Sequence, residues 1–133
     1  MNCKLQVINM KKNCPGQPRS GCPIASTLDL VGDRWTLVIL RDMLTGKSRF
    51  ADFLASPEGI STNILSDRLA LLNRAGLSQK KAYQQRPTRY EHVLTDKGEA
   101  LLPVLQELCK WGNRFVPETW VPPKSFMRRK PRR

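Results

Sequence analysis

The sequence predicts a mainly α-helical protein with one two-stranded β-hairpin. Three observations support this fold class. Between residues 21 and 77, apolar residues recur at helical spacing, and glycines and prolines separate the segments. From residue 77 to 94 the pattern changes to the alternation typical of strands. A last apolar stripe at helical spacing follows over residues 101–116. The length of 133 residues suits a single domain.

The chain carries a large excess of positive charge. It has 23 lysines and arginines against 11 acidic residues, a formal net charge of +12. Six of the basic residues lie in Lys124–Arg133, which holds no acid, so the body of the chain is basic as well. A polyanion is the natural partner of such a chain, and nucleic acid is the commonest one. The alternative is a basic end that serves solubility alone.

No segment indicates a membrane span or an export signal. The chain has no apolar run of about 18 residues, and its first ten residues lack a signal-peptide pattern. We therefore expect no membrane association and a cytoplasmic location, at the nucleoid if the polyanion is DNA.

Residues 1–20 read as a flexible leader, because lysines are scattered there among Asn, Gln, Gly and Pro. A first helix is expected to begin at Pro23, which suits the first turn, and to end before Gly32. Asp33 can cap the next helix, whose nearly all-apolar sequence up to Leu44 is typical of a buried core element.

Two further helices follow, separated by a turn at residues 57–59. Ser48 can cap the first, a short helix with an aromatic inner side. The second lies within Ile60–Leu77, where Ser61 can cap the first turn and Gly76 can take a left-handed conformation after the last. One broad face of this helix is apolar: Ile64, Leu65, Leu69, Leu71 and Leu72.

The opposite face of this second helix consists mostly of short polar side chains. Such a face is expected where the second helix of a helix-turn-helix lies in the major groove of DNA and reads base edges. The alternative is an ordinary amphipathic surface helix. Arg68 falls on the apolar side, so we expect its head group to find an acid or a carbonyl. The predicted DNA contacts are Ser48 and Arg49 at the entry to the unit, and Ser61, Thr62, Asn63, Ser66, Asp67, Asn73 and Arg74 in the recognition helix.

Residues 77–83 and 89–94 read as two strands joined by a polar connection. A hairpin of this kind after a recognition helix is a wing, placed to touch phosphates or the minor groove. The alternative is that its charges are solvated strand edges. The predicted contacts of the wing are Lys80, Lys81, Arg86, Thr88 and Arg89.

The last predicted helix begins at Thr95, a capping residue, and carries the apolar stripe of residues 101–116. The core of so small a domain would already be filled, so the stripe indicates that a helix of a partner lies against it. Pro103 either kinks this helix or moves its start. Residues 117–133 form a basic, Pro- and Arg-rich tail that we expect to be disordered in isolation.

Residues 21–116 resemble the HxlR-type winged helix-turn-helix transcription regulators, relatives of the MarR group. No matching block is specific alone, but the series is, because the blocks occur in order and at compatible spacing. The blocks are Cys22-Pro23-Ile24, GDRWTLVILRDML from Gly32, RFADF from Arg49, GISTNILSDRL from Gly59, AGL from Ala75, LTDKGEALLPVL from Leu94 and LCKWG from Leu108.

The resemblance implies a homodimer whose first and last helices form the interface, with the helix-turn-helix and wing contacting DNA. The implied interface residues are Ile24, Leu28, Leu101, Leu105, Leu108, Trp111 and Phe115. Thr62 and Asn63 stand where the family commonly has a proline or a charged residue, so base preference does not carry over.

Cys22 is the candidate sensor residue. In some members of the resembled family, a cysteine just before this proline reacts with oxidants or electrophiles, and a thiol at a helix N-terminus gains thiolate character. The alternative is an inert cysteine at a helix start. The spacing of Cys3, Cys14 and Cys22 does not suit a structural zinc site, and we expect neither metal nor cofactor.

The sequence therefore predicts a homodimeric, sequence-specific regulator, by default a repressor, that binds a pseudo-palindromic operator in double-stranded DNA and responds to an oxidant, aldehyde or other electrophile through Cys22. Two alternatives are a sequence-indifferent nucleoid protein driven by the basic tail and an interaction adapter that no longer reads DNA. An enzyme is not expected, because no base or positioned acid accompanies the thiol.

Overall fold

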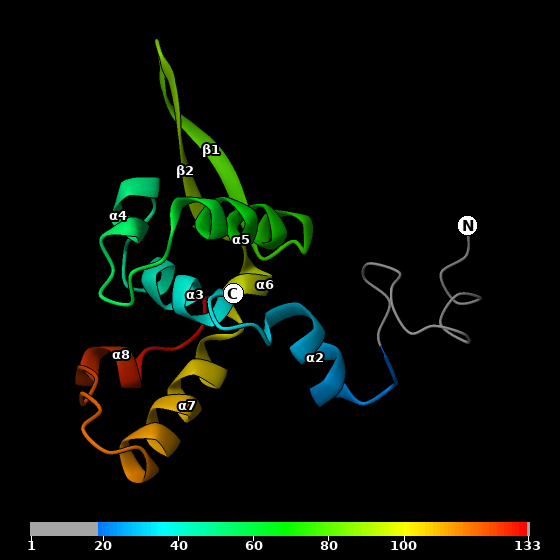
Figure 1. Ribbon diagram of the computed structural model, residues 1–133, viewed down its shortest axis with the longest axis vertical. Helices are drawn as coiled ribbons and strands as arrows, with labels where there is room; N and C mark the ends of the chain where they lie inside the picture. Colours follow the sequence, from blue (N-terminus) through cyan, green and yellow to red (C-terminus); the bar gives the residue numbers. More distant parts are fainter. Residues whose placement is uncertain (1–18, 133) are drawn as a thin grey trace.

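The computed structural model describes residues 19–132, in which a β-hairpin projects from a body of short helices (Figure 1). The predicted leader of residues 1–20, with Cys3 and Cys14, lies outside the described residues except for its last two. The elements in chain order are α2 (Pro23–Val31), α3 (Thr36–Leu44), α4 (Phe50–Leu54), α5 (Thr62–Arg74), β1 (Ser78–Gln85), β2 (Thr88–Leu94), α6 (Asp96–Glu99), α7 (Leu102–Phe115) and α8 (Lys124–Arg128).

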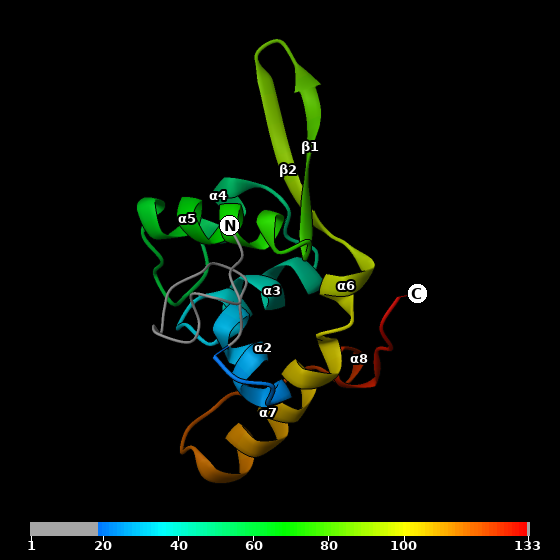
Figure 2. The same ribbon diagram turned by 90° about the vertical axis from the view of Figure 1, so that its right-hand side faces the viewer.

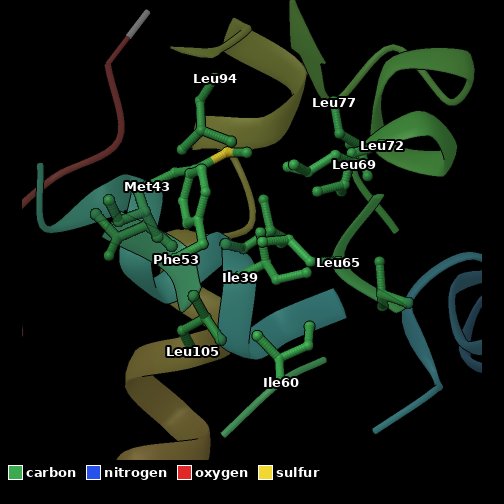
Figure 3. Packing of buried hydrophobic residues seen from close by; sticks show 14 residues of the cluster. Ile39, Met43, Phe53, Ile60, Leu65, Leu69, Leu72, Leu77, Leu94 and Leu105 are labelled. Atoms are coloured by element: carbon green, nitrogen blue, oxygen red, sulfur yellow. The ribbon is translucent and has the colours of Figure 1, made fainter. Parts of the chain in front are cut away.

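The hydrophobic core lies where α3, α4, α5 and the start of α7 meet (Figure 3). Phe53 of α4 is fully buried between leucines of α5 and the apolar side of α3. Helix α5 contributes Leu65, Leu69 and Leu72, all of which are buried. Because the apolar side of α5 is buried in this core, only the opposite side of the helix faces solvent.

The start of α3 is held by Asp33, as the sequence predicts. Its carboxylate accepts hydrogen bonds from the backbone N–H groups of Trp35, at 2.9 Å, and Thr36, at 3.0 Å, and from the Thr36 hydroxyl. These bonds satisfy donors that the first turn of a helix leaves unpaired. Asp33 also lies 3.0 Å from Nε of Arg68, so the same carboxylate joins α3 to α5.

The boundaries of α5 confirm both signals read from the sequence. The Ser61 hydroxyl accepts a hydrogen bond from the N–H of Ile64 at 3.3 Å. Gly76 follows the helix with φ of 77°, a conformation that a side chain would disfavour. Gly59, with φ of 73°, makes the turn between α4 and α5 possible for the same reason.

The hairpin is longer than its sequence pattern predicts. Strands β1 and β2 are antiparallel and pair from Ser78 opposite Leu94 to Gln85 opposite Thr88. The predicted connection of residues 84–88 is therefore mostly strand, and only Arg86 and Pro87 remain in the turn. Apart from Pro87, residues at the tip of the hairpin are all polar, so they lack the alternation of apolar and polar residues that predicts a strand.

The last helical region is two helices. The Thr95 hydroxyl caps α6 by accepting from the N–H of Gly98 at 3.2 Å, which confirms the predicted cap. Helix α6 ends at Glu99, and α7 starts at Leu102 with Pro103 in its first turn. Pro103 thus moves the start of the helix, since proline lacks the N–H that continuation of α6 would require.

The C-terminal segment folds back on the body, which corrects the expectation of a disordered tail. It turns at the far end of α7, forms α8 and returns toward α3 (Figure 1). The Gln106 amide donates to the backbone carbonyls of Phe126, Met127 and Arg129, at 3.0, 3.2 and 2.9 Å. The ring of Phe126 packs against the core. The composition of the segment predicted disorder because it contains no information on Gln106 and the core residues, which lie far from it in the sequence.

A buried carboxylate explains why this segment is held. The Glu99 side chain is only 3% exposed, and both of its oxygens accept from the Arg129 guanidinium, at 2.9 and 3.1 Å. Arg129 also donates to the backbone carbonyl of Leu44 at the end of α3. Arg132 donates to the carbonyl of Leu94 at 2.9 Å and lies 3.4 Å from Asp96. The tail therefore supplies the counter-charge that a buried acid requires.

Helix α2 lies to one side of the body in Figure 1. Val31 at its end is buried, whereas Ile24 is 70% and Leu28 51% exposed. An apolar helix side that finds no partner within its own chain is a common feature of subunit interfaces. Among the described residues, no helix is long and apolar enough to cross a bilayer.

Replacing Arg129 tests whether the tail is part of the fold. Arg129→Met leaves Glu99 buried with a weaker partner, so the free energy of unfolding should fall by about 2 kcal/mol. In a Glu99→Gln background the same replacement should cost less than half as much. Arg128→Met, which removes an exposed neighbouring charge, should cost under about 0.5 kcal/mol. Chemical denaturation of the native chain and the four variants measures these differences, and equal effects of the two arginine replacements would contradict the assignment.

Candidate nucleic-acid interface

Helix α5 and the wing lie at one end of the molecule, while α7 and α8 lie on the other side of α3 (Figures 1 and 2). The outer side of α5 carries small hydroxyl and amide groups, which can donate and accept hydrogen bonds to base edges. Six of the seven predicted recognition-helix residues are exposed: Ser61, Thr62, Asn63, Ser66, Asp67 and Arg74.

The two remaining polar residues of α5 turn toward the protein. Arg68 lies between Asp33 and Asp67, with 3.0 Å separating nitrogen and oxygen in each pair, as expected for a residue on the inner side. Asn73 is half-buried, and its Oδ1 accepts from the Ser78 hydroxyl at 2.9 Å. Asn73 therefore joins α5 to β1, and its contact with a base stays a prediction.

Residues before α4 connect the helix-turn-helix to the wing. Ser48 does not cap α4, because the Asp52 carboxylate accepts from the N–H of Arg49 instead, at 3.3 Å. The half-buried Ser48 donates its hydroxyl to Glu91 at 3.2 Å, and its carbonyl accepts from the N–H of His92 at 2.7 Å. Ser48 thus anchors β2, and its contact with DNA stays a prediction.

Arg49 stacks on the wing. Its guanidinium carbon lies 3.8 Å from the ring centroid of Tyr83, the residue at the irregularity between Ala82 and Gln84 of β1. A guanidinium over an aromatic face is attracted by the ring and keeps its edge N–H groups free for a phosphate. The sequence analysis missed Tyr83, although an aromatic in an otherwise polar strand was a visible signal.

The wing presents its basic residues to solvent. Lys80, Lys81, Arg86 and Arg89 are exposed, and the Lys80 ammonium lies 4.3 Å from the centre of the Tyr90 ring. Thr88 is also exposed, but its hydroxyl donates to the carbonyl of Gln85 at 3.2 Å and so serves the turn. Exposed lysines and arginines on a projecting hairpin are suited to phosphate contacts, which position a protein without reading sequence.

A second ionic cluster holds the turn between α4 and α5 against α3. Arg41 donates to both oxygens of Glu58, at 2.7 and 2.8 Å, and lies 2.9 Å from the buried Asp42. Asp42 also accepts from the Ser56 hydroxyl. The hydrogen bonds from Arg41 hold the pKa of Glu58 below its ordinary value. Sequence reasoning did not find this cluster, because charged pairs separated by many residues leave no local pattern.

His92 is packed in the junction of wing and body. Its ring is 8% exposed and meets the ring of Phe53 edge-on at 6.5 Å. Burial, with a smaller contribution from Lys80, holds the pKa of His92 below its ordinary 6.5. A buried neutral imidazole at this position supports packing.

The cysteines within the described residues differ in setting. Cys22 is exposed and stands directly before the first turn of α2. The nearby Arg19 is engaged by Asp29 at 2.6 Å. Cys109 is half-buried on α7, and burial raises the pKa of its thiol. In residues 19–132, no three His, Cys, Asp or Glu side chains converge as a metal site would require.

The predicted interface residues are mostly exposed on the single chain. Trp111 is 61%, Phe115 57% and Leu108 50% exposed, beside an open hollow along α7. Leu101 is half-buried. Leu105 is the exception: it is 7% exposed and belongs to the core of its own chain, so its assignment to the interface is corrected.

The pKa of His92 gives a pH dependence with a definite sign. The unfolded chain binds a proton to this residue near pH 6.5, whereas the folded chain does so only at lower pH. Stability should therefore fall as the pH drops from about 7.5 to about 5.5, with a slope of at most about 1.4 kcal/mol per pH unit from this group. Denaturant unfolding of the native chain and of His92→Gln should show a smaller fall for the variant. Parallel pH curves would contradict the assignment.

Comparisons with known proteins agree with this geometry. The profile of the HxlR-like helix-turn-helix family matches residues 30–120. YdeP of Bacillus subtilis, an HTH-type transcriptional regulator, is 34% identical over 95 residues, which are 71% of this chain and 74% of YdeP.

Two solved structures are also similar. The redox regulator HypR in its oxidised form is 31% identical with a TM-score of 0.64, over 70% of this chain and 96% of HypR. The reduced form of the regulator YodB from B. subtilis is 28% identical with a TM-score of 0.62, over 76% of this chain and 100% of YodB. With its capped outward-facing helix, its wing and these relatives, the chain belongs to the HxlR-like helix-turn-helix family of DNA-binding transcription regulators.

Proposed function

We propose that this chain acts as a homodimer on a pseudo-palindromic operator and represses transcription, without catalytic activity of its own. The observation that carries the proposal is the orientation of α5. Its leucines are buried in the core, so the polar side from Thr62 to Arg74 is turned to solvent beside the wing. A helix held in this way can enter the major groove of double-stranded DNA.

The residues divide into readers of bases and binders of phosphates. Thr62, Asn63 and Ser66 project from the N-terminal half of α5, the half that approaches base edges in helix-turn-helix proteins. We assign Arg49, Arg74 and the exposed basic residues of the wing to phosphates, because long cationic side chains neutralise the backbone at any sequence.

Two exposed apolar surfaces support dimerisation. Helix α2 offers Ile24 and Leu28, and α7 offers Leu108, Trp111 and Phe115. Burying them against the same surfaces of a second copy would remove a large apolar patch from water. A two-fold dimer would place its recognition helices in successive major grooves, about 34 Å apart.

The position of the C-terminal segment favours a sequence-specific regulator over a sequence-indifferent nucleoid protein. Arg129 and Arg132 are engaged by Glu99 and Asp96, and α8 lies across α3 from the wing. The tail therefore spends Arg129 on holding the fold and lies away from the wing, although Lys124, Arg128 and Lys130 are exposed. The regulator would work in the cytoplasm, at the nucleoid.

Responsiveness to oxidants or other electrophiles, aldehydes included, is a second part of the proposal. It is supported by the exposed Cys22 thiol at the start of α2 and by the likeness to the redox regulator HypR. Hydrogen peroxide would transfer one oxygen to the sulfur of Cys22, which becomes a sulfenic acid, and the other oxygen would leave as water. Because α2 belongs to the proposed dimer interface, a change at its first turn would alter the distance between the two recognition helices of the dimer.

DNA binding is tested with sequences selected from a random pool by the full chain. Asn63→Ala should weaken binding to the selected sequence about tenfold and leave binding to random DNA unchanged. Arg89→Gln should weaken both equally and lower the slope of affinity against salt by about one. Lys124→Gln, which removes a charge on α8, is the matched control and should leave the slope unchanged. Failure to select any sequence would contradict the proposal.

Sensing is tested by mobility shift with and without hydrogen peroxide. The affinity of the native chain for its selected DNA should change about fivefold or more, because Cys22 alone combines exposure with a helix N-terminus among the described cysteines. Cys22→Ser should bind equally in both conditions. Cys109→Ser is the control and should respond as the native chain does. A response that survives in Cys22→Ser would refute the role of this residue.

A further inference from the structure

We propose that a groove between α3, α7 and residues 119–126 binds a small, uncharged aromatic molecule that carries one hydrogen-bond donor. The groove has two adjoining parts, of about 510 and 780 Å³, which share Arg41, Cys109, Trp120 and Phe126 as lining residues. Volumes of this size are typical of small-molecule sites.

The groove is lined by aliphatic and aromatic side chains. Leu37 and Val38 of α3 and Leu108 of α7 are the aliphatic ones. Trp120 and Phe126 of the C-terminal segment line the same groove, and Trp120 is 78% exposed. A flat ring among such side chains removes apolar area from water.

The charges near the groove are already compensated, which disfavours an ionic ligand. Arg41 lines both parts, but its guanidinium is engaged by Glu58 and Asp42. Lys47, which lines the larger part, donates to the Ser56 hydroxyl at 2.9 Å and lies 3.9 Å from Asp42. Arg129, also in that part, is paired with Glu99 at 2.9 Å. The Cys109 thiol is held neutral, because burial raises its pKa, so it offers a soft contact and no reactive thiolate. The ligand is therefore uncharged and binds without a covalent bond.

Asn113 supplies the polar recognition. Its amide nitrogen donates to the Thr119 hydroxyl at 2.9 Å and to the carbonyl of Trp120 at 2.8 Å, which orients the side chain. Asn113 is exposed, and its Oδ1 accepts no hydrogen bond from the residues that the structure describes, so the oxygen is open to a ligand in the groove. A carbonyl oxygen in the lining of an apolar groove selects a ligand with a hydroxyl or N–H group.

The groove has a direct connection to the proposed dimer surface. Leu108 lines the groove and also the open hollow that Trp111 and Phe115 form along α7. A ligand that displaces Leu108 would change the surface offered to a second copy. This regulatory consequence rests on the proposed function, whereas the binding site itself does not.

The probe is 2-naphthol, titrated into the full chain by calorimetry without DNA. It should bind with micromolar affinity. The donor-free analogue 2-methoxynaphthalene should bind about fivefold more weakly, because Asn113 then lacks a partner. The anion 2-naphthoate should bind at least about tenfold more weakly, because the cations that line the groove, Arg41, Lys47 and Arg129, each have an acidic partner.

Gly112 provides a blocking variant with a matched control. It lines the groove, and a Cβ at this position meets no other atom within 4 Å. Gly112→Leu should fill the groove and weaken 2-naphthol binding at least about tenfold. Gly112→Ala makes the same backbone change without the bulk and should bind within about twofold of the native chain. Trp120→Ala should weaken binding about fivefold through loss of the aromatic wall.

Binding of 2-naphthol that is the same in Gly112→Leu and Gly112→Ala would overturn the proposal. The absence of 2-naphthol binding would also overturn it. If sedimentation then showed that Gly112→Leu changes the oligomeric state, the occupant of the groove would be a second copy of the chain. Equal affinities for 2-naphthol and 2-methoxynaphthalene would overturn the role of Asn113. These measurements contain no DNA, so a failure of the operator proposal leaves their outcome unaffected.

Discussion

The one-sided burial of α5 is the constraint on which the rest of the structure depends. Leu65, Leu69 and Leu72 contribute to the same core as Phe53 of α4 and Ile39 of α3 (Figure 3). Rotating the helix about its axis would expose these leucines and bury Asn63 or Asp67 without partners, and both changes are unfavourable. The polar side of α5 is therefore presented as a rigid surface, and a rigid surface can discriminate between base sequences.

Ionic contacts inside the body complete this arrangement and set its charge. Asp33 holds the start of α3 and reaches Arg68 of α5, while Arg41 joins α3 to Glu58 in the turn before α5. Glu99 takes up Arg129 from the C-terminal segment. Most acids of the body are thus paired within the chain, which leaves the exposed lysines and arginines of the wing as a positive surface. The basic tail does not extend the positive surface of the wing, because it lies away from the wing and Arg129 is paired with Glu99.

Local signals in the sequence predicted the helices well, and long-range contacts explain where they fell short. The caps at Asp33, Ser61 and Thr95 are confirmed, because a cap depends on residues three positions apart. Ser48, Asn73 and Leu105 were assigned to surfaces but make contacts inside the chain, with partners that no local pattern identifies. The tail was read from composition as disordered, although a buried acid some thirty residues earlier in the chain holds it in place. Exposure supports the remaining proposed DNA contacts, because Thr62, Asn63 and Ser66 are exposed in the structure.

Hydroxyl-radical footprinting of the full chain on a selected DNA tests the central claim most directly. If α5 is presented outward twice by a two-fold dimer, two protected segments should appear about one helical turn apart, each flanked by protection from a wing. The protection should be symmetric about the centre of the site. A single protected segment, or continuous protection without periodicity, would contradict the account.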